Sequence, residues 1–178
     1  MAGLTNTARE RRMWRNLFSF PNPVNEVSAR LVAGGVVIMA AAALIFDLRW
    51  LTVVMAYGFL ARVATGPTLS PLGQLVTRVV TPRLPVAAKP VPGPPKRFAQ
   101  GMGAVITTTA AVLWVGFGLA TAGKVVLGLV LVAATLESVF AFCIGCVIFA
   151  ALMRANLIPE SVCEQCNDIT LRRAPAAS

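Results

Sequence analysis

The chain has 178 residues, of which 57% are hydrophobic and 13% are charged, and its mean hydropathy is +0.74. Soluble domains contain about 45–50% apolar and about 25% charged residues, so this composition excludes an ordinary soluble protein and indicates a membrane protein. The net charge of +9 does not indicate a nucleic-acid partner, because the basic residues lie between hydrophobic segments rather than in one soluble module.

The N-terminal segment 1–20 is basic and aromatic, and it lacks the apolar run and cleavage site of a removable signal peptide. We expect it to bind lipid headgroups from the cytoplasmic side. It precedes a transmembrane domain expected at 21–156. In this domain Asn22 followed by Pro23 is typical of a helix start, which predicts the first membrane helix at 23–46.

The rest of the chain predicts an all-α membrane fold with four transmembrane helices in two antiparallel hairpins. The short connection 47–50 allows only a tight turn, so the apolar run at 48–64 returns antiparallel to the first helix. A proline-rich segment at 82–95 predicts an extended linker without chemistry. Two further helices are expected at 98–120 and 125–155, the last of them longer than the bilayer core.

A short amphipathic helix is expected between the two hairpins. Ser70 followed by Pro71 is a cap-and-proline signal, and apolar residues with helical spacing follow over 71–81. This segment is too short to span the bilayer and is expected to lie at the membrane interface. The spacing predicts that Leu75 and Val79 face lipid or the helical bundle.

The distribution of Lys and Arg predicts the orientation. On one side of the membrane, the two predicted turns contain only Arg49 and Lys124 as basic residues. Most of the other Lys and Arg lie on the opposite side, in the N-terminal segment, the linker region with Lys96, and the tail at 157–178. Basic residues concentrate in cytoplasmic loops. Both ends of the chain are therefore expected in the cytoplasm.

The four cysteines form two Cys-x-x-Cys pairs near the C-terminus. Cys143 and Cys146 lie in the fourth predicted helix, and Cys163 and Cys166 lie in the tail. Residues at i and i+3 share one helix face, so the first two thiols are within reach of each other. Histidine is absent from the chain, so haem ligation by imidazole, Cys/His zinc fingers and Ser-His hydrolysis are excluded.

Three interpretations of these cysteines remain open. In the first, Cys143 and Cys146 are small buried apolar side chains and the tail pair is incidental. In the second, the four cysteines bind zinc and clamp the tail to the bundle. In the third, they exchange thiols, disulfides or persulfides. In a reducing cytoplasm a non-structural Cys-x-x-Cys is more often catalytic. In this third interpretation the tail pair acts as a relay for the membrane pair.

Glu137 is the only carboxylate expected at membrane depth, where an unpaired charge is unfavourable and polar residues are often functional. In a continuous fourth helix it points away from the two cysteines. Its expected partners are the Thr107–Thr109 hydroxyls, Ser138 or Arg62. Glu137 is therefore either a structural clamp or part of a proton or ion path, and the second role would make the protein a small-solute permease.

The runs Phe20–Arg30, Ser70–Gly73 and Phe142–Cys146 resemble a bacterial family of small integral membrane proteins of unknown function, over residues 18 to 153. That family is associated with genes for thiosulfate sulfurtransferases and thioredoxin-like proteins. The resemblance implies the bacterial inner membrane, thiol or sulfur metabolism, and a cytoplasmic thioredoxin-like or sulfurtransferase-like partner. A non-catalytic membrane subunit or scaffold is the main alternative.

Overall fold

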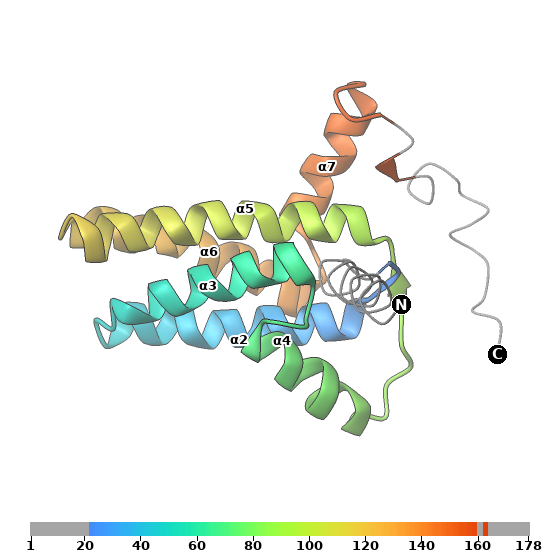
Figure 1. Cartoon of the computed structure of the whole chain (residues 1–178), viewed down its shortest axis with the longest axis horizontal. Coiled ribbons are helices and arrows are strands. Elements are labelled where there is room, and N and C mark those ends of the chain that lie inside the picture. Colours follow the sequence, from blue (N-terminus) through green and yellow to red (C-terminus); the bar gives the residue numbers. More distant parts are fainter. Residues whose placement is uncertain (1–21, 160–161, 164–178) are drawn as a thin grey trace, which may run out of the picture.

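The computed structural model describes residues 22–159 and 162–163, in which the regular structure is helical apart from one pair of two-residue strands. The basic N-terminal segment 1–20 and Cys166 lie outside the described residues. Four helices run side by side (Figure 1): α2 (Glu26–Ile45), α3 (Trp50–Thr65), α5 (Gly93–Ala111) and α6 (Ala120–Phe140). A π-helical turn extends α5 to Gly116.

Each connection starts the next helix at the end of the bundle where the previous helix finished, so successive helices run in opposite directions (Figure 1). The four helices therefore form an antiparallel bundle. α3 packs against α5, α2 against α6, and α5 against α6. The core between them consists of apolar side chains, among them Val36, Ala40, Met55, Phe59, Ala104, Trp114, Leu127 and Val130. The tight turn expected at 47–50 is present, and Asp47 in this turn forms an ion pair with Lys124 near the start of α6.

Three of the described helices are long and apolar enough to cross a membrane: Glu26–Ile45, Gly93–Gly116 and Ala120–Phe140. The helix α3 has 16 residues and α7 (Ile144–Arg154) has 11, so both are shorter. Large apolar side chains cover the outside of the bundle, among them Ile38, Val53, Leu60, Val105, Leu129 and Val132. An apolar exterior of this kind is typical of a protein surrounded by lipid.

The single helix expected at 125–155 is two helices in the structure. The helix α6 begins five residues earlier, at Ala120, and ends at Phe140, and α7 starts at Ile144 and leaves the direction of the bundle (Figure 1). Ala141 between them adopts a left-handed conformation with φ 56°. The prediction of one long, tilted helix is therefore wrong at the position of the first cysteine pair.

The start of α2 is tied to the linker that precedes α5. The strands β1 (Val24–Asn25) and β2 (Pro90–Val91) pair antiparallel, and the side chains of Glu26 and Lys89 form an ion pair of 2.8 Å. Asn25 caps α2 by accepting a hydrogen bond of 3.0 Å from the backbone two residues later. The predicted cap at Asn22 is therefore wrong by three residues, because this pairing keeps the preceding residues extended.

The helix α5 begins at Gly93 rather than at 98, so the proline-rich linker is shorter than expected. Pro94 and Pro95 occupy its first turn, where proline is tolerated because the missing N–H would have no helical partner. As a result Lys96 is a helical residue that is 8% exposed, and its expected place in an exposed linker is wrong.

The short helix between the hairpins is present as α4 (Pro71–Leu75), and a π-helical turn and a 3₁₀ turn extend it to Arg83. Ser70 caps it as predicted, since its Oγ accepts the Gly73 N–H at 3.2 Å. Its buried residues are Gly73 and Val76, whereas Leu75 and Val79 are 52% and 39% exposed. Leu75 and Val79 therefore do not face the bundle, and the other alternative, that they face lipid, stays a prediction.

Candidate functional site

The break between α6 and α7 is held by hydrogen bonds at the end of α6. The Phe142 N–H bonds to the Leu136 carbonyl at 3.0 Å, which closes the helix around the left-handed Ala141. The Arg30 guanidinium on α2 donates to the Ser138 carbonyl at 3.0 and 3.2 Å and to the Val139 carbonyl at 3.1 Å. A cation from another helix thus satisfies the carbonyls that the break leaves without helical partners.

Cys143 is the N-cap residue of α7. Its backbone is extended, and its Sγ accepts a hydrogen bond of 3.3 Å from the Cys146 N–H. The N-terminus of a helix stabilises negative charge through its free N–H groups and its dipole, so a thiolate on Cys143 is stabilised there. Cys146 lies one turn into the helix and is half-buried, and both are free thiols.

Gly145, between the two cysteines, seats the first turn of α7 against α5. A Cβ atom at this position would lie 2.6 Å from both the Cα and the Cβ of Ala99. Carbon atoms prefer separations of about 3.5–4.0 Å, so only glycine permits this approach. This close contact fixes the position of Cys143 and Cys146 along the axis of α5.

An ion pair lies beside the two thiols. The Lys96 Nζ and the Glu137 Oε1 are 2.6 Å apart, and their side chains are only 11% and 16% exposed. The charges of both act on Cys143 and Cys146. The ion-pair partner of Glu137 is Lys96, which was not among the predicted partners, because α5 begins at Gly93 and includes this lysine. Of the predicted partners, Arg62 lines the same cavity and interacts electrostatically with Glu137. The predicted orientation of Glu137 away from the thiols is wrong, because α7 does not continue the direction of α6.

A second buried cation lies deeper in the bundle. Arg62 on α3 is 6% exposed, and its guanidinium carbon lies 4.4 Å from the centre of the Phe59 ring. Its Nε donates to Gln100 Oε1 at 2.9 Å and its Nη1 donates to Ser70 Oγ at 3.2 Å. The sequence signal was a single Arg within an apolar run, but Gln100 and Ser70 could not be recognised as its partners from spacing.

Two cavities meet at Cys143. The first, here called the inner cavity, has a volume of about 310 Å³ between α2, α3, α5 and α6, and its polar lining comes from Arg62, Gln100, Glu137 and Cys143. The second, here called the outer groove, has a volume of about 680 Å³ and runs along α7 past both cysteines and Lys96. Cys143 lines both, so it lies between the inner cavity and the outer groove.

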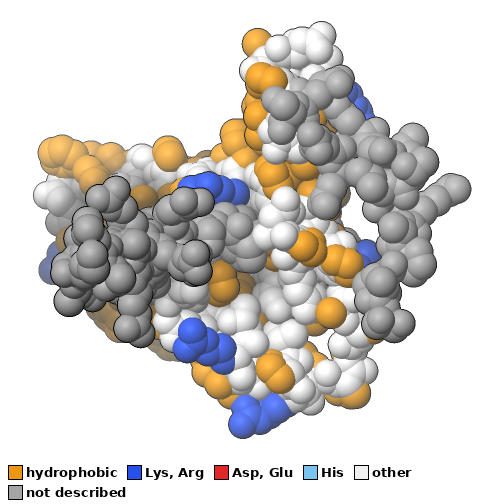
Figure 2. All heavy atoms as spheres, turned by 45° about the vertical axis from the view of Figure 1, so that its right-hand side comes forward, with side chains coloured by type: hydrophobic (Ala, Val, Ile, Leu, Met, Phe, Trp, Pro, Cys, Tyr) orange, Lys and Arg blue, Asp and Glu red, His pale blue; other side chains and the backbone are white. Residues whose placement is uncertain are grey.

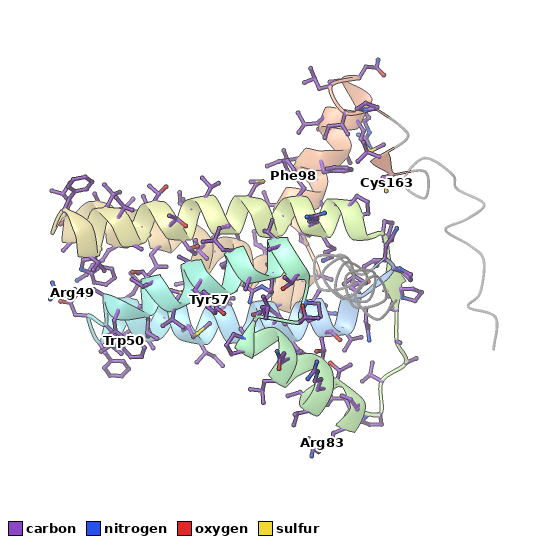
Figure 3. The ribbon with its side chains drawn as sticks, viewed as in Figure 1. Arg49, Trp50, Tyr57, Arg83, Phe98 and Cys163 are labelled. Atoms are coloured by element: carbon purple, nitrogen blue, oxygen red, sulfur yellow. The ribbon has the colours of Figure 1, made fainter. Side chains whose placement is uncertain are left out.

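Cys163, the first cysteine of the tail, packs against α7. It is 4% exposed and lies in an apolar cluster with Phe149 and Met153, which also line the outer groove. Figure 3 shows Cys163 beside α7 and Phe98 of α5 near the base of that helix. Cys163 is disulfide-bonded, whereas Cys143 and Cys146 are free. The tail thus returns to the helix that carries the first cysteine pair.

Within residues 22–159 and 162–163, no three side chains of His, Cys, Asp or Glu gather closely enough to share a metal ion. The expected zinc site needs Cys166 as well as Cys143, Cys146 and Cys163, and Cys166 lies outside these residues. The zinc site stays a prediction.

The comparisons with known proteins give one family. The family model described as "Domain of unknown function (DUF4395)" matches residues 24–154, which contain every helix described above and the pair Cys143/Cys146. The comparisons with curated proteins and with solved structures gave no match. Since the model covers well over half of the chain, the protein belongs to the DUF4395 family, a domain family of unknown function, as the resemblance had indicated.

Proposed function

We propose that Cys143 and Cys146 form a dithiol–disulfide couple that exchanges with a cytoplasmic thiol partner. The observation that carries this proposal is the position of Cys143 as the N-cap of α7, with the Cys146 N–H bonded to its sulfur. A free thiol at a helix N-terminus, next to a cationic side chain and open to a groove, has the surroundings of a reactive cysteine. Cys143 is only 8% exposed, but a buried cysteine with a purely structural role has no need of a helix N-terminus, a neighbouring cation and a groove.

The exchange proceeds in two balanced steps. The Cys143 thiolate attacks one sulfur of a partner disulfide, which forms a mixed disulfide and releases the second partner sulfur as a thiolate. The Cys146 thiol then loses its proton to solvent in the outer groove and attacks Cys143, which releases the first partner sulfur. The pair is oxidised and the partner is reduced by two electrons, and the reverse sequence reduces the pair.

Lys96 and Glu137 have separate roles in this exchange. The Lys96 ammonium offsets negative charge on a Cys143 thiolate, while the ion pair with Glu137 keeps the lysine beside the outer groove. The same nucleophile also accepts sulfane sulfur when it attacks the outer sulfur of a persulfide on a sulfurtransferase-like partner. The partner's S–S bond breaks, its cysteine leaves as a thiolate, and Cys143 carries the persulfide. The partner in either case is a cytoplasmic thioredoxin-like or sulfurtransferase-like protein.

The tail pair, Cys163 and Cys166, relays electrons between the partner and the membrane pair in this proposal. Cys163 packs on Phe149 and Met153 of α7, and these side chains line the outer groove together with Cys143 and Cys146. The relay requires the tail to move along this groove until one of its sulfurs reaches Cys143. A tail held permanently on the far half of α7 would not serve as a relay.

The proposed topology has four spans in the inner membrane, with both termini in the cytoplasm. The helix α3 is the fourth span, since it packs along α5 and exposes apolar side chains, although its 16 residues extend only about 24 Å. A span shorter than the bilayer core is accommodated by local thinning. On the face seen in Figure 2, the side chains drawn in colour include several Lys and Arg and no Asp or Glu. An excess of Lys and Arg is typical of the cytoplasmic side.

The test is a redox titration of the protein in lipid nanodiscs against glutathione buffers, with Cys163 and Cys166 replaced by Ser. Maleimide–polyethylene glycol labelling then reports the number of free thiols. We expect the free thiols of Cys143 and Cys146 to disappear together, at one midpoint glutathione redox ratio. In the variant Cys146→Ser, we expect a mixed disulfide between Cys143 and glutathione. Independent labelling of the two cysteines at every glutathione ratio would refute the proposal.

A further inference from the structure

The inner cavity has the composition of a site for an apolar ligand with one polar end. Most of its lining is aliphatic and comes from α2, α5 and α6, whereas Arg62, Gln100, Glu137 and Cys143 are its polar residues. Its volume of about 310 Å³ lies at the lower end of the range of ligand pockets, about 300–1,000 Å³. A compact ring fits this space better than an extended polar substrate.

The cavity also opens toward the outside of the bundle. Leu129 and Val132 line it and are 59% and 58% exposed on the surface of α6. In the proposed topology this surface faces lipid, so a ligand enters the cavity from the bilayer. The ligand is therefore a membrane-soluble molecule.

The polar end of the cavity offers hydrogen-bond donors. Arg62 has five N–H donors. Within the described residues, its Nε donates to Gln100 and its Nη1 donates to Ser70, so further N–H groups remain to donate to a ligand. The Gln100 oxygen accepts from Arg62, so its amide nitrogen remains as a donor on the same cavity wall. Donors in an apolar cavity match a ligand that carries carbonyl oxygens and no positive charge.

We propose that the inner cavity binds the ring of a membrane quinone, which oxidises the Cys143/Cys146 dithiol. This inference rests on the proposed dithiol couple. Two thiols lose two electrons and two protons and form one S–S bond, and the quinone gains both electrons and both protons on its two oxygens and becomes a hydroquinone. Cys143 is placed for this step because it lines the cavity as well as the outer groove.

The experiment uses the full chain, reduced and then freed of reductant, in quinone-free nanodiscs under anaerobic conditions. The probe is decylubiquinone, whose fully substituted ring does not add thiols. Its absorbance reports conversion to the hydroquinone, and peptide mass spectrometry reports the Cys143–Cys146 disulfide. We expect one hydroquinone for each disulfide formed.

Ala133→Phe is the test variant, because Ala133 on α6 lines the inner cavity and a phenyl ring there fills it. Ala122→Phe is the matched control, since Ala122 lies on the exposed surface of the same helix and lines neither cavity at Cys143. We expect Ala133→Phe to slow the reaction with quinone by about tenfold or more, equivalent to about 1.4 kcal/mol. Exchange with glutathione should be unchanged in both variants.

Each result is decisive. Equal quinone rates in the two variants, or no hydroquinone from a wild-type protein that does exchange with glutathione, would overturn the quinone site and leave the dithiol couple standing. Failure to exchange with glutathione as well would overturn the proposed function itself. Co-purified lipid in the cavity that decylubiquinone does not displace would also contradict the inference, since it would identify an acyl-chain site.

Discussion

The glycine between the two cysteines gives the sharpest test of the site. In Gly145→Ala the new Cβ would lie 2.6 Å from two carbon atoms of Ala99, about 1 Å closer than carbon atoms normally approach. One of these atoms is the backbone Cα of Ala99 in α5, so no side-chain rotation relieves the contact. Overpacking of this kind destabilises proteins by about 1–3 kcal/mol.

The assay is unfolding in mixed micelles, together with the rate at which maleimide labels Cys143 and Cys146. We expect Gly145→Ala to lower the free energy of unfolding by about 1–3 kcal/mol and to change the labelling rate, because the start of α7 must move away from α5. Ala99→Gly should rescue the variant only in part, since it removes the Cβ and leaves the Cα.

Gly101→Ala is the matched control for this change. Gly101 lies in the middle of α5, two residues after Ala99, and a Cβ there meets no atom within 4 Å. A Gly to Ala change inside a helix gains up to about 1 kcal/mol, so this control should be neutral or stabilising. The reasoning fails if Gly145→Ala is as stable as the control and keeps the wild-type labelling rate.

Three further results are expected. Lys96→Met should destabilise the protein by about 3 kcal/mol because it leaves the Glu137 carboxylate buried without its partner, whereas adding Glu137→Gln should recover most of that loss in the same unfolding assay. Replacing both Cys163 and Cys166 by Ser should leave the membrane pair in one redox state in cells, as measured by alkylation trapping, and normal cycling would contradict the relay. A cysteine introduced at the exposed Ala88 should be labelled by membrane-impermeant maleimide in inverted vesicles and not in spheroplasts, and the opposite result would reverse the proposed orientation.

Much of the bundle could be predicted from the sequence because its signals are local. Long apolar runs predicted three of the spans, a short connection with Asp47 and Arg49 predicted the first turn, and Ser70 before Pro71 predicted the cap of α4. Such features depend on neighbours within a few residues, so their physical cause is visible in the sequence. The helix α3 was also located, although it is shorter than a typical span.

The break at the cysteines could not be predicted, because its cause lies far away in the chain. The segment Ala141–Cys143 contains neither Gly nor Pro, and the carbonyls at the end of α6 are bonded by Arg30, more than one hundred residues earlier. The ion pair of Lys96 with Glu137 likewise joins two helices. Sequence reasoning therefore found the chemical groups of the site but not their arrangement.

The strand pair between Val24–Asn25 and Pro90–Val91 has a consequence for engineering of the chain. Together with the turn that ends at Arg83, it anchors both ends of the exposed segment 84–88, so the two hairpins keep their positions whatever the length of this segment. Each doubling of a flexible loop costs only about 0.6 kcal/mol in closure entropy. A fluorescent protein or an affinity tag inserted within 84–88 should therefore leave the bundle folded, which makes this segment the natural place for a reporter.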